Sequence, residues 1–87
     1  MERLMVLKKT YYPLAGFTGI TDSSIAYCKI LMLSREGQVM NRTTDNGVLI
    51  SGGLWYQYYP SVGSIMLNPQ QPINEGESIN IVYDTDI

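Results

Sequence analysis

The fold is decided by the last third of the chain, YQYYPSVGSIMLNP (residues 56–69) followed by PINEGESINIVY (residues 72–83). Its pattern predicts an aromatic strand, a Pro-Ser-x-Gly turn, a short apolar strand, a proline-bounded loop and a final strand. Within that final strand, Ile79, Ile81 and Tyr83 alternate with more polar positions, so one inner face is expected. This order of short strands and turns is typical of the end of a small β-sandwich.

The preceding residues predict further short elements. Strands are expected over residues 4–12, 27–34, from Val39, over 48–51 and over 54–59. The 27–34 segment is apolar at nearly every position, which predicts a central strand covered on both faces. We expect Asp22 to cap one helical turn at 23–26, Gly37 to supply a positive φ, and Asn46-Gly47 to form a hairpin turn. Together these patterns predict an all-β fold of six to seven short strands, an antiparallel sandwich (Ig-like or jelly-roll-like) that fills residues 1–87 as one domain.

The composition favours association. Charged residues make up 16% of the 87 residues, against about 25% in a typical domain, while hydrophobic residues make up 45%. A chain this short buries only about 60% of its unfolded surface, so few charges must cover a large surface. We therefore expect part of the surface to face another protein, ahead of the alternative that tyrosine, serine, threonine and asparagine solvate it.

Several classes of function are disfavoured. The net charge of -2 and the pI near 4.8 give no basic patch for direct nucleic-acid binding. No stretch approaches 18 apolar residues and the start lacks a signal-peptide pattern, so we expect a protein made in a cytoplasm, not exported and not in a membrane. Cys28 is the single cysteine and there is no histidine, so neither a disulfide nor a zinc motif can form. We expect Cys28 to be a buried, inert thiol.

No constellation of catalytic residues emerges. Without histidine no serine has an obvious activating base. The acidic pairs Asp84 with Asp86 and Glu75 with Glu77 are expected to be solvated turn residues. A calcium site at Asp84 and Asp86 stays open, although an Asp-x-Asp pair lacks the remaining oxygen ligands. The sequence therefore predicts a protein that is not an enzyme and has no cofactor.

The aromatic strand offers the candidate site, formed by Trp55, Tyr56, Tyr58 and Tyr59. Alternate residues of a strand share a face, so Tyr56 and Tyr58 lie on one side and Trp55 and Tyr59 on the other. Both faces are buried in one alternative. In the other, Trp55 and Tyr59 face outward and offer a stacking surface for another protein or for a sugar ring.

Five short motifs run through the chain: GFTGITD (16–22), REG (35–37), PSVGSI (60–65), PINEGE (72–77) and INIVY (79–83). Their order resembles small Ig-like β-sandwich modules in structural proteins of tailed bacteriophages, particularly those of gut Bacteroidetes. Such modules occur in capsid decorations, head fibres and tail proteins. The resemblance implies a virion structural protein that forms a homo-oligomer, such as a trimer, and contacts other virion proteins. The alternative hypothesis is a carbohydrate-binding module that uses the aromatic strand as its stacking platform.

Overall fold

The computed structural model describes residues 6–85. Within this range the chain forms seven strands, a 3-10 turn and a short α-helix. In chain order these elements are β1 (Val6–Tyr11), β2 (Gly19–Thr21), η1 (Ser23–Ile25), β3 (Lys29–Arg35), β4 (Gln38–Arg42), α1 (Asn46–Leu49), β5 (Trp55–Tyr59), β6 (Ser64–Leu67) and β7 (Ile79–Asp84).

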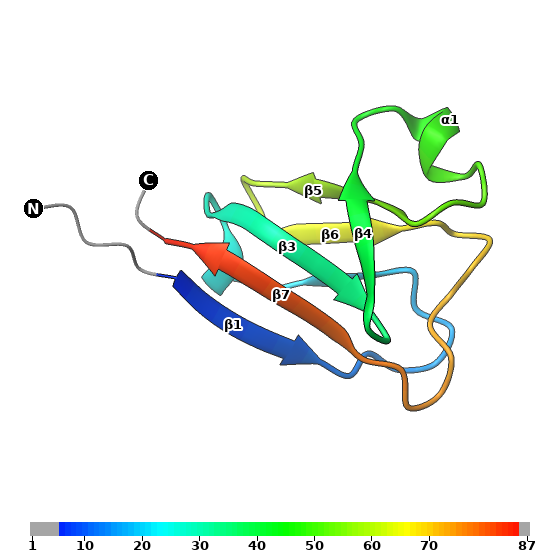
Figure 1. Cartoon of the computed structure of the whole chain (residues 1–87), viewed down its shortest axis with the longest axis horizontal. Helices are drawn as coiled ribbons and strands as arrows, with labels where there is room; N and C mark the ends of the chain where they lie inside the picture. Colours follow the sequence, from blue (N-terminus) through cyan, green and yellow to red (C-terminus); the bar gives the residue numbers. More distant parts are fainter. Residues whose placement is uncertain (1–5, 86–87) are drawn as a thin grey trace, which may run out of the picture.

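The strands form one curled sheet in the order β1-β7-β3-β4-β5-β6-β2. Figure 1 shows β1, β7 and β3 side by side, with β4 crossing toward β5 and β6. The strand β4 joins the two halves, because it pairs with β3 through Val39 and Met40 and with β5 through Asn41 and Arg42. The expected all-β, sandwich-like fold is thereby confirmed. One detail differs from a fully antiparallel sheet, since β4 and β5 run parallel.

The core lies between the two halves of the sheet. From β7, Ile79, Ile81 and Tyr83 point into it and are almost completely buried, which confirms the inner face predicted from their alternation. From the opposite half, Ile65 and Leu67 of β6 meet them in the same apolar cluster. Because every strand adds a side chain to this cluster or to its margin, the chain closes around one core.

The strand predicted over residues 48–51 is wrong, because this segment belongs to α1 and the turn that follows it. The Asp45 side chain accepts hydrogen bonds from the amides of Gly47 and Val48, and such a cap starts a helix where a hairpin turn was expected. Leu49 then turns inward and is buried. The helical detour also explains the parallel pair, since a parallel connection needs a crossover longer than a hairpin turn.

The strand predicted over 27–34 is central, as expected, but its outer face is covered only in part, at Ser34. It lies between β7 and β4 and begins at Lys29. Leu33 is buried, whereas Leu31 and Met32 are exposed on the outer side. The register shifts between Ile30 and Met32, and this bulge turns two consecutive apolar side chains outward.

The turns predicted at Gly37 and at the Pro-Ser-x-Gly motif and the cap predicted at Asp22 are confirmed, unlike the hairpin turn at Asn46-Gly47. Glu36 and Gly37 both have positive φ and connect β3 to β4 as a two-residue hairpin loop. Gly63 ends the turn between β5 and β6 with a φ of 67°. Asp22 caps η1 by accepting the Ser24 amide at 2.9 Å.

Side-chain hydrogen bonds connect β1 to the residue that follows β2, where the curled sheet has its two edges. Asp22 Oδ2 accepts from Lys9 Nζ and from Tyr11 Oη, each at 2.8 Å. The Lys9 bond, followed by the Ser24 amide and Tyr11, holds the pKa of Asp22 well below its usual range. Burial, followed by the bond to Asp22, raises the pKa of Tyr11 well above its ordinary value. The carboxylate of Asp22 therefore stays ionised and ties the two edges together.

Candidate interaction surfaces

Acidic residues form no metal centre in the part of the chain that the structure describes. No group of three or more histidine, cysteine, aspartate or glutamate side chains comes together there. Asp84 is buried in β7, which corrects the expectation of a solvated turn residue, and Asp86 lies outside the described residues. Glu77 is also more than a solvated acid, because it forms an ion pair with Arg35.

Cys28 lies directly before β3 and is half-buried at the margin of the core. Its thiol donates to the carbonyl oxygen of Ala26 at 3.5 Å. Burial raises the pKa of this thiol, and the nearby charge of Asp84 raises it further. The thiolate is therefore disfavoured, as it should be in an unreactive cysteine.

The four aromatic candidates of β5 divide between the two faces of the strand. Tyr56 and Tyr58 pair across the sheet with Leu67 and Ile65 and are buried in the core. Neither ring has a free face for a ligand, so for these two residues the structure shows the buried alternative that the sequence left open. Trp55 and Tyr59 lie on the outer face, but the half-buried Trp55 indole lies directly against the backbone of Gly53. Tyr59 is thus the β5 aromatic ring with the freest surface, 43% exposed.

A chain of hydrogen bonds fixes the position of the Tyr59 ring. Its hydroxyl donates to Gln57 Oε1 at 2.7 Å, and Gln57 Nε2 donates to Asn46 Oδ1, also at 2.7 Å. Gln57 is 6% exposed, so both ends of its amide are used where water has little access. Because Asn46 begins α1, the short helix that the sequence did not predict serves as the support for the ring.

Two hollows flank Tyr59 on this outer face. One has a volume of about 430 Å³ and is lined by Ile50, Met66 and Pro69 together with Thr18 and other residues. The second has a volume of about 400 Å³ and is lined by residues of the 43–46 segment. Asn46, Gln57 and Tyr59 line both, so the ring stands at their common boundary. We call this surface the Tyr59 groove.

A second surface is the apolar loop, residues 12–17, which connects β1 to β2. Three of its side chains are large, apolar and exposed: Tyr12 (73%), Leu14 (70%) and Phe17 (53%). The backbone of the loop is nevertheless anchored, because Gly16 donates to the Ile73 carbonyl and Ile73 donates to the Phe17 carbonyl, both at 2.8 Å. This loop was not among the sites predicted from the sequence. The clue in the sequence is that large apolar residues stand among turn-forming residues, in a segment that the core does not need because other strands fill it.

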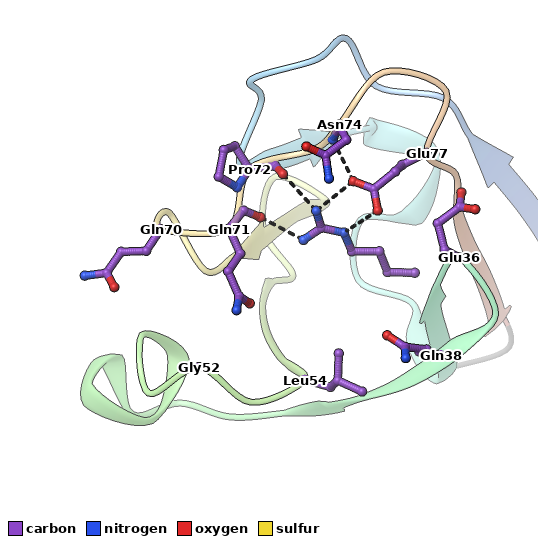
Figure 2. Close-up of a pocket in the computed structure, with 10 residues that line it drawn as sticks. Glu36, Gln38, Gly52, Leu54, Gln70, Gln71, Pro72, Asn74 and Glu77 are labelled. Atoms are coloured by element: carbon purple, nitrogen blue, oxygen red, sulfur yellow. Dashed lines mark hydrogen bonds and ion pairs between the residues drawn. The ribbon is translucent and has the colours of Figure 1, made fainter.

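The third surface is a crevice of about 470 Å³ between the 70–77 loop and the 52–54 segment. Figure 2 shows Asn74 and Glu77 on one side of it, with Gln38 and Leu54 on the opposite side. At its wall the Arg35 guanidinium binds both carboxylate oxygens of Glu77, at 2.8 and 3.4 Å.

Arg35 acts in this crevice as a connection between two parts of the backbone. Besides Glu77, it donates to the carbonyls of Gln71 at 2.7 Å and Pro72 at 2.8 Å. Its bond to Glu77, followed by the Asn74 amide, lowers the pKa of Glu77. Because the charge of Arg35 is already neutralised, the crevice offers no free cation to an anionic ligand. We therefore interpret it as the anchor of the 70–77 loop.

No family model matches the chain, and no curated protein or solved structure shows significant similarity to it. Within residues 6–85 no helix is long and apolar enough to cross a membrane.

Proposed function

We propose that this protein is a non-enzymatic structural building block. It would form a homo-oligomer, such as a trimer, and bind neighbouring proteins. Its proposed setting is the particle of a tailed bacteriophage, where it would decorate or cement the capsid or anchor a fibre or tail component. The phage setting is supported by the resemblance of the five sequence motifs. The assembly role is supported by the apolar loop.

The apolar loop carries this proposal because it combines exposure with a fixed backbone. Leu14 and Phe17 leave most of their apolar surface in water, which is unfavourable at about 25 cal/mol per Å². The two backbone hydrogen bonds to the buried Ile73 hold the loop in place, so these side chains are presented from a rigid base. Binding a partner then orders little additional chain, which favours tight association.

The low charge of the chain supports the same conclusion. Only 14 of 87 residues are Lys, Arg, Asp or Glu (6 basic and 8 acidic). Two of the acids, Asp22 and Glu77, are already engaged with Lys9 and Arg35. Few free charges remain to keep copies of the protein apart.

Sedimentation velocity over a range of concentrations tests self-association. We expect the wild-type protein to form a closed oligomer and the double variant Leu14→Ser with Phe17→Ser to sediment as a monomer. Val62→Ser is the matched control, since Val62 is as exposed as Phe17 but lies in a separate turn. Thermal unfolding should change little in all variants, because surface substitutions usually stay within about 0.5 kcal/mol.

Two results would contradict the proposal. If the wild-type protein remains monomeric at every concentration, the proposed self-association is wrong. Mass spectrometry of phage particles purified from an infected culture should detect this polypeptide. If it is absent from the particles, the proposed location in the virion is wrong.

A further inference from the structure

The Tyr59 groove has the features of a ligand site that the assembly role does not use. Its two hollows, about 430 and 400 Å³, each fall within the range of about 300–1,000 Å³ found for small-molecule sites. The exposed ring of Tyr59 stands between them. We propose that this groove binds a neutral glycan, with one sugar ring stacked on Tyr59 and neighbouring units in the flanking hollows.

The lining of the groove selects for a neutral, hydroxyl-bearing ligand. None of the residues that line either hollow carries a charge. Among the described residues, neither the side-chain NH₂ of Asn46 nor the hydroxyl of Thr44 takes part in a hydrogen bond, so both are available to sugar hydroxyls. Ile50 and Met66 add apolar surface for the C–H face of a sugar ring. The lining therefore supplies no cation to an anionic ligand, and the neighbouring Arg42 is engaged with the carbonyl and the ring of Tyr58.

The Tyr59 ring is also held in place before any ligand arrives. The bonds from Tyr59 to Gln57 and from Gln57 to Asn46 fix it over the outer face of β5. A flat ring that does not need to be ordered loses less conformational entropy on binding, which favours affinity.

The sheet topology favours a glycan over a peptide in this groove. An extended peptide gains most of its affinity by pairing with a free strand edge. Here β5 is paired with β4 on one side and β6 on the other, and β6 is in turn paired with β2. Because β4 pairs with β5 at Trp55 and Tyr56 alone, the groove offers a peptide only the short backbone edge of residues 57–59. Its ring and side chains are the chemistry that a sugar uses.

The test is a titration of the ¹⁵N-labelled protein with neutral oligosaccharides built from glucose, mannose, galactose and N-acetylglucosamine, followed by NMR. At least one should shift the amide signals of β5, α1 and the 43–45 segment, with little dependence on salt. Tyr59→Ala should weaken that binding by about tenfold or more, the factor that corresponds to about 1.4 kcal/mol. Tyr59→Phe keeps the ring but loses the bond to Gln57, so a smaller loss is expected.

Tyr27→Ala is the control, because Tyr27 is exposed but lies outside the groove. It should bind as the wild type does, and thermal unfolding should show that every variant is folded. The inference is overturned if no oligosaccharide of the series shifts these signals, if Tyr59→Ala binds as tightly as the wild type, or if an acidic glycan or a peptide binds there more tightly. A monomeric protein that binds these sugars would contradict the assembly role and leave this inference standing.

Discussion

Tyr58 makes the sharpest test of how the core is held together. Its hydroxyl donates to the Ile25 carbonyl at 2.5 Å and accepts the Cys28 amide at 3.1 Å, so it connects β5 to the chain around η1. Tyr58→Phe keeps the ring and removes both bonds. Ile25 is fully buried, so its carbonyl cannot turn to water.

The loss in the free energy of unfolding depends on which hydrogen bonds the Ile25 carbonyl and the Cys28 amide can form without the hydroxyl. Leaving a buried polar group unpaired costs about 1–3 kcal/mol. The Cys28 amide also approaches the Ile25 carbonyl at 3.4 Å, so these two groups partly satisfy each other after the hydroxyl is lost. We therefore expect Tyr58→Phe to lower the free energy of unfolding by about 1–2 kcal/mol, which is less than two full penalties.

Urea unfolding followed by tryptophan fluorescence measures this change, and thermal unfolding should show a Tm lower by about 4–8 °C per kcal/mol. Tyr56→Phe is the matched control, since Tyr56 lies on the same face of β5 and its hydroxyl makes no hydrogen bond among the described residues. It should stay within about 0.5 kcal/mol of the wild type. Equal effects of the two substitutions would refute the role given to the Tyr58 hydroxyl.

Two further predictions concern a turn and the response to acid. Gly63 and Gly76 both have positive φ, but a Cβ at Gly63 would lie 2.1 Å from the Asp22 carbonyl oxygen, whereas Gly76 faces open space. Urea unfolding should therefore show that Gly76→Ala costs about 1–2 kcal/mol and Gly63→Ala clearly more; equal costs would contradict the crowding. Asp22 and Glu77 have lowered pKa values in the folded state, so the unfolded chain binds more protons and their stabilisation is lost as the pH falls below about 4. Unfolding measured from neutral to acidic pH should show this loss, and the double variant Asp22→Asn with Glu77→Gln should show a flatter profile; an unchanged profile would contradict it.

Local sequence patterns predicted correctly those elements whose residues favour a single backbone conformation or a single buried face. The alternation in β7 allows one inner face, and Gly37 and Gly63 adopt backbone angles that other residues seldom take. The segment at 43–49 is different, because Asp45 can cap a helix and Asn46-Gly47 can form a hairpin turn. The choice between them depends on contacts with distant residues, namely the bond from Gln57 to Asn46 and the burial of Leu49. Those contacts are not encoded within the segment itself.

The candidate site was predicted in part for a similar reason. Strand parity separated Tyr56 and Tyr58 from Trp55 and Tyr59, as the structure confirms. Parity alone does not tell which face meets the core, because that depends on the strand opposite. The exposure of Phe17 was also beyond local patterns, since it depends on other side chains having filled the core already.

The two surfaces that we propose are held in place in the same way, which would account for the scarcity of charge. Tyr59 is held through Gln57, which is buried, and the apolar loop is held through the backbone of Ile73, which is buried as well. In both cases the folded core fixes an exposed aromatic or apolar group before any partner arrives. A charged surface binds through long side chains that must be ordered and desolvated, whereas these groups require little of either. If both proposals hold, the sparse charge follows from a surface used for contact, and Thr18 directly joins Phe17 of the loop to the lining of the groove.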